Sequence, residues 1–325
     1  MTSYAIEAEA LTKRFGGPTT GTTALAGVDL AAREGSVLGV LGPNGAGKTT
    51  AVRILATLLN ADSGTARVNG FDVAHQPQQV RQSIGLTGQF ASVDEDLTGS
   101  QNLVLIGQLL DLNPREAKRR AAELLKWFDL SEAANRVAKN YSGGMRRRLD
   151  LAASLVGRPS IIFLDEPTTG LDPAKREDMW DVVRSLVDDG STALLTTQYL
   201  EEADALADEI TVIDHGRVIA HDTPHGLKRV VGGQRLTVRP SDPGRHDEVF
   251  TLLAGLGARV PEPEGRGSLT VPVDGDEVLP VVVSRLAEAG IGVEELSLHL
   301  PSLDEVFFTL TGLRHEADPA KEEVA

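Results

Sequence analysis

A glycine-rich segment near the N-terminus places strict limits on the fold of this chain. The segment joins the apolar run 37–41 to a helical stretch, and it reads Gly42-Pro43-Asn44-Gly45-Ala46-Gly47-Lys48-Thr49. Glycines at this spacing let the backbone turn tightly, so that its N–H groups surround phosphate oxygens at the positive end of the next helix. Lysine at the end of such a loop bridges the β- and γ-phosphates, and the adjacent hydroxyl binds Mg²⁺. The strand–helix context favours this interpretation over an ordinary glycine-rich turn.

A second apolar run ends in two carboxylates. Residues 161–164 fit a strand that is buried on both faces of a parallel sheet, and Asp165 and Glu166 follow at its exit. Alone, such a pair often marks only the start of a loop, but a phosphate-binding loop needs an acidic partner. We therefore expect Asp165 to hold Mg²⁺ through water. Glu166, one residue further on, is the expected general base for the attacking water.

Length and composition narrow the class further. The chain has 325 residues, which predicts one large domain and a smaller one. A formal net charge of -15 disfavours a protein that coats nucleic acid. Cysteine is absent, which excludes disulfides and thiolate metal sites. No apolar run approaches the roughly 20 residues of a membrane-spanning helix, so we expect any contact with a membrane to come through a partner protein.

The order of the predicted elements divides the chain into two domains. Residues 1–229 alternate apolar strands with amphipathic helices, an α/β pattern, and helical signals replace strands over about 97–156. Within that insertion, Asn113 and Pro114 predict a helix start, followed by an apolar face of Ala117, Ala121, Leu124, Leu125 and Phe128. Residues 236–313 predict a small α+β (ferredoxin-like) domain with the order β-α-β-β-α-β and one more helix. We expect 314–325 to be a disordered tail.

The elements of the smaller domain can be placed more closely. We expect strands near 236–239, 258–260, 268–273 and 293–299, and helices near 246–256, 277–289 and 302–312. Leu269, Val271 and Val273 alternate with polar or exposed positions, which predicts a half-buried strand.

The motif that decides the class lies upstream of Asp165 and opens a helix. It reads Tyr141-Ser142-Gly143-Gly144-Met145 and resembles the signature motif of ABC ATPases. The rest of that family's pattern is present in order, with Phe15 near the start, Gln89 after an apolar strand, and Gly170-Leu171-Asp172 after the acidic strand. The resemblance covers about residues 5–225, and it implies a P-loop NTPase fold with an inserted helical subdomain.

Two positions depart from the general family pattern. Met145 stands where glutamine is usual, and Gln198 stands where a switch histidine is expected. The segments 141–150 and 196–204, which contain these residues, are similar to those of the daunorubicin/doxorubicin-resistance ATP-binding subunits. Residues 302–307 in the smaller domain are similar to the C-terminal motif of that group.

The resemblance implies how ATP is bound. Two subunits would form a head-to-tail dimer, in which the loop of one and the signature of the other enclose each nucleotide. The expected contacts with ATP come from Phe15, Gly42, Asn44, Gly45, Ala46, Gly47, Lys48, Thr49, Thr50, Ser142, Gly143, Gly144 and Asp172.

The resemblance also suggests roles for single side chains. Phe15 would stack on adenine, unless it is an ordinary core or surface residue. Asp172 would contact the partner's phosphate-binding loop. Thr49, Gln89 and Asp165 are the expected Mg²⁺ ligands, with a solvated loop residue as the alternative for Gln89. Lys48, Glu166 and Gln198 are the expected catalytic residues.

The implied function is that of the ATP-hydrolysing subunit of an ABC exporter. It would lie peripherally at the cytoplasmic face of the membrane, pair with a second copy or a close homologue, and drive a separate permease that moves amphipathic drugs, natural products or lipids. The cargo, and the choice between homodimer and heterodimer, stay open.

A soluble ABC ATPase that acts on ribosomes or DNA is an alternative, but such proteins usually carry two cassettes or a long coiled-coil insertion. A regulator with little turnover is a further alternative, motivated by Gln198. The run 146–148 could bind acidic groups on a partner, but we expect it to form a solvated helix face with local salt bridges.

Overall fold

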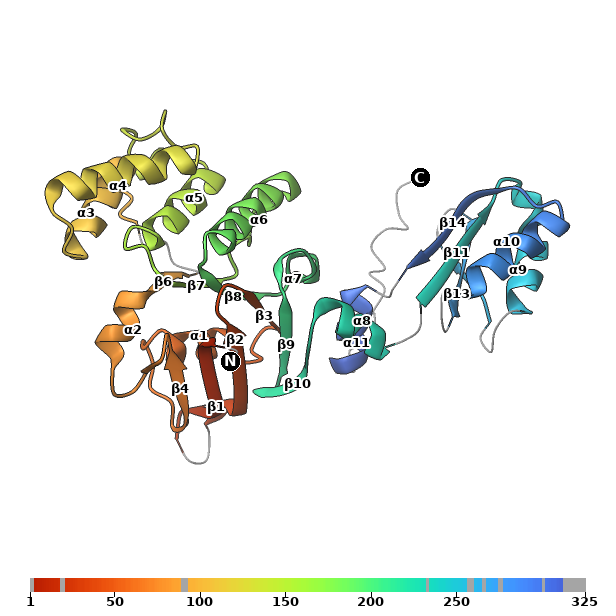
Figure 1. Cartoon of the computed structure of the whole chain (residues 1–325), viewed down its shortest axis with the longest axis horizontal. Coiled ribbons are helices and arrows are strands. Elements are labelled where there is room, and N and C mark those ends of the chain that lie inside the picture. Colours follow the sequence, from red (N-terminus) through yellow and green to blue (C-terminus); the bar gives the residue numbers. More distant parts are fainter. Residues whose placement is uncertain are drawn as a thin grey trace. The chain divides into compact units, whose positions relative to one another are not determined.

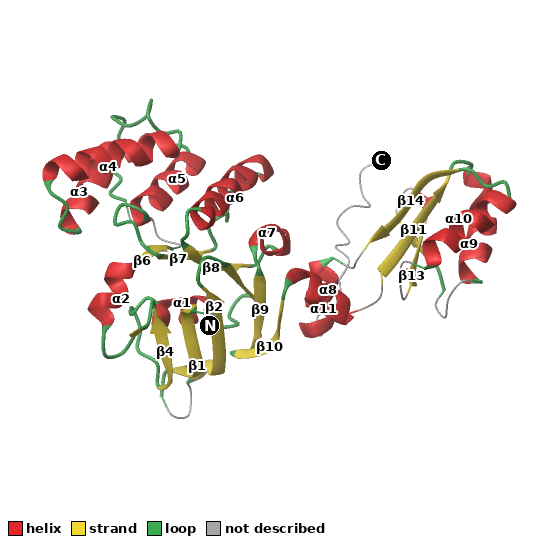
Figure 2. Ribbon diagram, viewed as in Figure 1, coloured by secondary structure: helices red, strands yellow, loops and turns green. Residues whose placement is uncertain are grey.

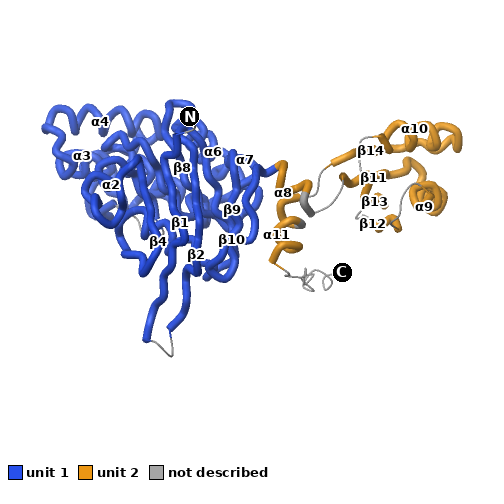
Figure 3. The backbone as a smooth tube through the Cα atoms, turned by 60° about the horizontal axis from the view of Figure 1, so that its bottom comes forward, with its two compact units in different colours: residues 1–224 blue, residues 225–325 orange. Residues whose placement is uncertain are grey.

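The computed structural model describes residues 3–17, 21–88, 93–231, 234–255, 260–264, 267–273, 277–299 and 302–311. The chain forms two compact units, residues 1–224 and 225–325 (Figure 3). Within the described ranges, no helix has the length and apolar character needed to cross a membrane. Gln89 and the tail 314–325 lie outside the described residues, so the predictions for them stay predictions.

The first unit is built on two sheets (Figures 1 and 2). One is antiparallel with the order β2-β1-β4-β5, formed by β1 (Tyr4–Phe15), β2 (Thr22–Arg33), β4 (Ser63–Val68) and β5 (Phe71–Asp72). The other has the order β10-β9-β3-β8-β7-β6, formed by β3 (Val37–Leu41), β6 (Ile84–Thr87), β7 (Ile161–Asp165), β8 (Thr192–Thr197), β9 (Glu209–Asp214) and β10 (Arg217–Asp222). Its strands run parallel except β10, which pairs antiparallel with β9.

Helix α1 (Lys48–Leu55) contributes to a core that both sheets share. Ile54 and Leu55 of α1 are fully buried in one cluster with residues such as Ile6 of β1 and Phe163 of β7. Strands β3, β7 and β8 are buried at every residue, which explains their continuous apolar runs. Each fully buried aliphatic side chain contributes on the order of 2 kcal/mol to this core.

The remaining helices of this unit are α2 (Pro77–Ser83), α3 (Gly99–Leu109), α4 (Pro114–Trp127), α5 (Gly143–Ser154), α6 (Pro173–Asp188) and α7 (Leu200–Leu206). Helices α3, α4 and α5 follow β6 and pack on one another as the predicted helical insertion (Figure 1). Helix α4 begins where expected, because the Asn113 side chain accepts hydrogen bonds from the N–H groups of Arg115 and Glu116. Its buried residues include Ala117, Ala121, Leu124 and Leu125. Local sequence therefore accounts for this helix start and its apolar face.

The register of the parallel strands decides where the connecting loops emerge. Leu41 at the end of β3 pairs with Thr197 of β8, and Thr196 pairs with Asp165 of β7. On the other side of β7, Leu164 pairs with Thr87 of β6. Because these strands run in one direction and end nearly level, the loops at their carboxyl ends meet at the same edge of the sheet.

The second unit contains the predicted small α+β fold. It comprises α8 (Pro224–Val231), β11 (Gln234–Pro240), α9 (His246–Ala254), β12 (Glu262–Glu264), β13 (Ser268–Val273), α10 (Val278–Glu288), β14 (Val293–His299) and α11 (Leu303–Thr311). All neighbouring strands in the sheet, of order β12-β13-β11-β14, are antiparallel. With α9 and α10 between the strands, this is the ferredoxin-like order. The core of this unit includes Leu236, Val238, Val249, Leu253, Leu269, Val271, Val282 and Leu286.

Several details of the second unit differ from the sequence prediction. The second strand, expected near 258–260, lies at Glu262–Glu264, and residues 256–259 are outside the described ranges. Strand β13 is buried on both faces rather than half-buried, because its polar residues Ser268 and Thr270 are buried as well. The Thr270 hydroxyl forms a 2.9 Å hydrogen bond with the Thr237 hydroxyl on β11. The two compact units divide between Pro224 and His225, at the start of α8.

Candidate nucleotide-binding site

The glycine-rich loop leaves β3 and packs so closely against β2 and β9 that two of its glycines cannot be replaced. A Cβ atom on Gly42 would lie 2.2 Å from the carbonyl oxygen of Ile213. Gly47 has a φ of +113°, and its Cβ would lie 2.4 Å from the carbonyl oxygen of Ala24. The loop therefore holds its shape through backbone contacts, and it lines a cleft together with Glu166. The lining consists of Ala24, Asn44, Gly45, Ala46, Gly47, Lys48, Thr49, Thr50 and Glu166.

Lys48, the first residue of α1, points back into this loop. Its Nζ donates hydrogen bonds to the carbonyl oxygens of Gly42 at 2.6 Å and Pro43 at 3.2 Å. Burial lowers the pKa of Lys48, and attraction by the carboxylates of Glu166 and Asp165 opposes that change. Phosphate oxygens are stronger acceptors than carbonyls, so they can take over these donors inside the loop.

The hydroxyl of Thr49 and the carboxylate of Asp165 meet at the expected metal position. Thr49 Oγ1 donates to Asp165 Oδ1 at 3.3 Å, and Thr196 Oγ1 on β8 donates to the same oxygen at 2.5 Å. Mg²⁺ prefers hard oxygen ligands and usually binds through one or two carboxylates together with phosphates and water. Thr49 and Asp165 supply oxygen donors of this kind beside the phosphate-binding loop, so these residues fit Mg²⁺.

Glu166 follows Asp165 in an unusual backbone conformation. Its φ is +51°, in the left-handed region, which costs a residue other than glycine roughly 1–2 kcal/mol. The N–H of Glu166 donates to the carbonyl oxygen of Thr196 at 2.9 Å, and its carboxylate accepts a 3.3 Å hydrogen bond from the Thr169 hydroxyl. The carboxylate thus reaches the cleft beside the phosphate-binding loop, as a water-activating group would have to do.

Gln198 and Phe15 lie at two further strand ends. Gln198 is exposed directly after β8, one residue beyond the Thr197 that pairs with the end of β3. Phe15 is 46% exposed at the end of β1, which rules out the core role that we kept as an alternative. Lys13 Nζ lies 5.8 Å from the centroid of its ring. Stacking of Phe15 on adenine and donation by Gln198 to phosphate stay predictions.

The signature segment forms the N-terminus of α5. Ser142 is the N-cap residue, and its hydroxyl accepts a hydrogen bond from the N–H of Met145 at 3.2 Å. Tyr141 is buried and donates from its hydroxyl to the carbonyl oxygen of Ala133 at 2.7 Å, which anchors the segment. Ser142 and Gly143 are exposed, and neither lines the cleft of the phosphate-binding loop. The chain therefore presents two separate helix N-termini that suit phosphate.

Asp172 is also outside that cleft. It is the N-cap residue of α6, where its Oδ1 accepts a 3.0 Å hydrogen bond from the N–H of Lys175 and its carboxylate pairs with the Lys175 side chain. Hydrogen bonds from Lys175 hold the pKa of Asp172 below its usual value. Within this chain, Asp172 caps a helix, and its contact with a partner's loop stays a prediction.

Comparison with known proteins identifies the family. Residues 25–169 match the family model described as ABC transporter, and 223–311 match that of the C-terminal domain of DrrA1-3-like ATP-binding proteins. The chain is 54% identical over 324 residues to the daunorubicin resistance ATP-binding protein DrrA2 of Streptomyces coeruleorubidus, with 99% of each chain covered. The chain belongs to the daunorubicin-resistance group of ABC ATPases. It is also 50% identical to the daunorubicin/doxorubicin resistance protein DrrA of Streptomyces peucetius, covering 99% of this chain and 96% of that one.

Solved structures confirm the fold of the ABC ATPase. A dimeric ATP-binding cassette in a post-hydrolysis state, bound to ADP and Pi, matches with a TM-score of 0.62 and 25% identity. The match covers 67% of this chain and 98% of that one. The prediction of an ATP-hydrolysing enzyme with the P-loop NTPase fold is thereby confirmed, and its substrate is ATP.

Arg147 differs from the sequence prediction. We expected residues 146–148 to form a solvated helix face. The Arg147 side chain is instead only 17% exposed, and its guanidinium donates a hydrogen bond to the carbonyl oxygen of Glu166. Burial lowers the pKa of Arg147, while Asp150 most strongly opposes that change. Helical periodicity could not reveal this, because the acceptors are main-chain carbonyls that lie far away in the sequence.

Glu202 of α7 is a second residue that the sequence did not single out. It is fully buried, and neither carboxylate oxygen has a hydrogen-bond partner among the described residues. Burial raises the pKa of Glu202, and the nearby Thr197, Thr168 and Trp180 side chains oppose the rise only in part. The pKa of the Glu202 carboxyl is therefore higher in the folded chain than in the unfolded chain.

Replacing Lys48 with alanine should abolish ATP binding, because the only side-chain cation inside the described loop disappears. A matched control is Arg53→Ala, which removes one positive charge from an exposed position on the same helix. Isothermal titration with Mg-ATP should show no binding for Lys48→Ala and unchanged binding for Arg53→Ala. Equal ATP affinity of the two variants would contradict this assignment of the site.

Replacing Glu202 with glutamine should change how stability depends on pH. The raised pKa means that Glu202 favours folding below its unfolded value of 4.5 and that this contribution is lost as pH rises through the folded pKa. The variant should therefore gain stability relative to the wild type as pH rises above 4.5, by about 1.4 kcal/mol per unit of pKa elevation. Urea unfolding followed by tryptophan fluorescence measures this in the first unit, since both Trp127 and Trp180 lie there.

The neighbouring exposed acid provides the control for that experiment. Glu201→Gln removes the same charge from the same turn of α7, but from a solvated position. Its stability should follow the wild type across the pH range. A parallel pH dependence of Glu202→Gln and the wild type would show that Glu202 titrates normally in the folded chain.

Proposed function

We propose that this ABC ATPase works as a head-to-tail dimer at the cytoplasmic face of a membrane, where it drives export of amphipathic drugs or related natural products through a separate permease. The observation that carries the dimer is the exposed N-terminus of α5. It presents Ser142 and Gly143 to solvent, away from the cleft that the chain's own phosphate-binding loop lines. A phosphate bound there has to come from a nucleotide held by another subunit.

The chemistry of that second anion site supports the same arrangement. Helix α5 has 12 residues, so its N-terminus carries a substantial partial positive charge. Gly143 has no atoms within 4 Å of the position that a Cβ would occupy, so space is left for a ligand above the backbone. Two nucleotides at the interface would then join the subunits, and loss of the γ-phosphate would release them.

The residues of the cleft have distinct roles in hydrolysis. Lys48 binds the β- and γ-phosphates, and the Thr49 hydroxyl and Asp165 hold Mg²⁺. The bound Mg²⁺ supplies positive charge to the phosphate oxygens, which stabilises charge that develops during phosphoryl transfer. Glu166 orients the attacking water and accepts its proton. Gln198 donates a hydrogen bond to the γ-phosphate, and unlike histidine it stays neutral across physiological pH.

The relatives support the class of cargo. Their names refer to daunorubicin and doxorubicin, and, at 37% and 32% identity, to Nod factor export in Ralstonia nicotianae and linearmycin resistance in Bacillus subtilis. The match of 223–311 to the DrrA1-3-like C-terminal domain links the second unit to this group rather than to ABC ATPases in general. Action on ribosomes or DNA is disfavoured by the net charge of -15.

Replacing Glu166 with glutamine should leave ATP binding intact but slow hydrolysis by about 100- to 10,000-fold, because an amide cannot accept the proton from water. An ATP-bound dimer should therefore accumulate, visible by size-exclusion chromatography with light scattering in the presence of Mg-ATP. The double variant Glu166→Gln/Lys48→Ala serves as control and should stay monomeric. A monomer at saturating ATP for the single variant would rule out the homodimer and leave a heterodimer with a close homologue.

Export can be measured directly in inside-out membrane vesicles that contain this chain and the membrane protein that co-purifies with it. Daunorubicin is the probe, and its fluorescence should fall as it accumulates inside the vesicles on addition of Mg-ATP. Vesicles with Glu166→Gln should show no accumulation. Phosphate release without accumulation would show that the cargo is different, and the absence of both would favour a regulator with little turnover.

A further inference from the structure

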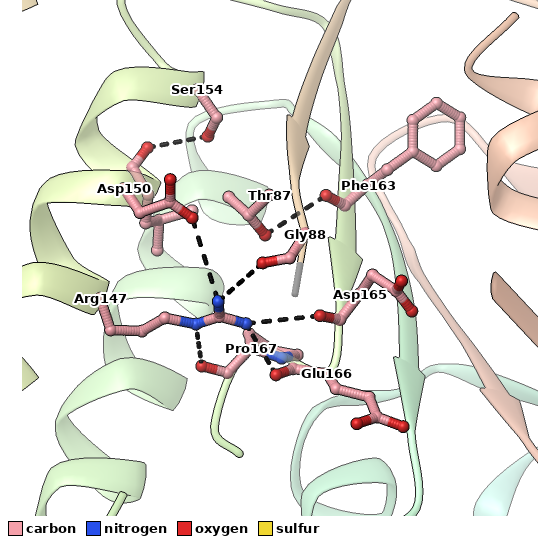
Figure 4. A network of polar contacts seen from close by, with 10 residues as sticks. Thr87, Gly88, Arg147, Asp150, Ser154, Phe163, Asp165, Glu166 and Pro167 are labelled. Atoms are coloured by element: carbon pink, nitrogen blue, oxygen red, sulfur yellow. Dashed lines mark hydrogen bonds and ion pairs between the residues drawn. The ribbon is translucent and has the colours of Figure 1, made fainter. Parts of the chain in front are cut away.

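The guanidinium group of Arg147 connects α5 with the segments that follow β6 and β7, at the carboxyl edge of the six-stranded sheet (Figure 4). Arg147 Nε donates to the carbonyl oxygen of Pro167 at 2.7 Å, and Nη2 donates to those of Glu166 at 2.7 Å and Asp165 at 3.3 Å. Its Nη1 donates to the carbonyl oxygen of Gly88, directly after β6, at 2.9 Å. The same nitrogen lies 3.9 Å from Asp150 Oδ2, one turn further along α5.

These contacts involve the backbone on both sides of Glu166. Figure 4 shows the carbonyl groups of Asp165 and Glu166 directed toward Arg147, while their carboxylates are directed away from it. Three consecutive carbonyls accept from one planar cation, so the orientations of three successive peptide groups are fixed together. Charge-assisted hydrogen bonds of this kind are about twice as strong as neutral ones.

The backbone of Glu166 needs such support. Its left-handed φ of +51° is unfavourable for a residue with a side chain, and such conformations persist only where the surroundings hold them. Among the described residues, the other backbone hydrogen bonds of Glu166 are from its N–H to the carbonyl oxygen of Thr196 and from the N–H of Thr169 to its own carbonyl oxygen. Without Arg147, the peptide groups that aim the carboxylate at the cleft would lose their common donor.

We infer that Arg147 is a positioning residue for ATP hydrolysis, which sets the direction of the Glu166 carboxylate from the helix that begins at the signature segment. The inference rests on the proposed role of Glu166 as the general base. Ser142 and Gly143 begin α5, and Arg147 lies on its next turn. A displacement of this helix is therefore passed to the backbone of Glu166. Binding of a phosphate at the start of α5 and water activation in the same chain's own cleft would be coupled through this one side chain.

The test uses the full chain with Arg147→Lys and Arg147→Met, and it measures single-turnover hydrolysis and ATP affinity separately. Lysine keeps the charge but cannot serve all of these carbonyls with its single nitrogen. Both variants should bind ATP with unchanged affinity and form the ATP-dependent dimer, while the hydrolysis rate falls about 10- to 100-fold, as a misdirected catalytic group predicts. Lysine should lose less than methionine.

A double-mutant cycle separates positioning from general structural damage. If Arg147 acts through the Glu166 carboxylate, adding Arg147→Met to the Glu166→Gln variant should not slow its residual hydrolysis further. If Arg147 only holds the fold together, the rate should fall by the same factor in both backgrounds. The control is Arg148→Lys on the same helix, where Arg148 donates to the carbonyl oxygen of Phe128 and pairs with Asp129. This variant should hydrolyse ATP at the wild-type rate.

The outcomes distinguish this inference from the proposed function. Full hydrolysis by Glu166→Gln would overturn the general base and, with it, the role of Arg147. Slow hydrolysis by Glu166→Gln with a wild-type rate for Arg147→Met would overturn only the inference about Arg147. A loss of ATP affinity or a lowered unfolding temperature that accounts for the slower rate of both Arg147 variants would assign Arg147 a structural role instead.

Discussion

Parallel hydrogen bonding of β3, β8, β7 and β6 in a nearly level register is the constraint on which the site depends. It brings the phosphate-binding loop, Gln198, the Asp165–Glu166 pair and Gly88 to one edge of the sheet, although they are far apart along the chain. Strands β3, β7 and β8 are buried at every residue, so their backbones are shielded from water. The buried strands therefore position the charged and polar side chains that follow their carboxyl ends.

Main-chain N–H and carbonyl groups provide many of the polar interactions at that edge of the sheet. Two helix N-termini, those of α1 and α5, present N–H groups that suit phosphate, and only the first belongs to the cleft beside Glu166. Carbonyl oxygens of the same region are directed to two cations, Lys48 inside the loop and Arg147 behind the acidic strand. Because both cations are partly buried, their charges act at short range and with little screening by water. The positions of these two cations relative to the two carboxylates define the site.

Much of this could be predicted from the sequence because the relevant signals are local. Strand, glycine-rich loop and helix follow one another within about 20 residues, and the Asn113 cap and the apolar face of α4 need no distant contact. Family resemblance added Phe15, Asp172 and Gln198, whose roles the structure leaves as predictions. The role of Arg147 could not be predicted, since a run of three arginines on a helix is typical of a solvated face and nothing in their spacing points to carbonyl groups some 20 residues away. The buried Glu202 was missed for the same reason.

By itself, the sequence determined the class of the protein, the order of its elements and the chemistry of its nucleotide loop. These features depend on the types and spacing of residues within short segments of the chain. The tertiary structure decided which of these segments share a site. It separated the exposed N-terminus of the signature helix from the chain's own cleft, left Phe15 exposed rather than in the core, and directed Arg147 to the backbone of Glu166. These outcomes depend on strand register and helix packing, which arise from contacts between residues that are distant in the chain.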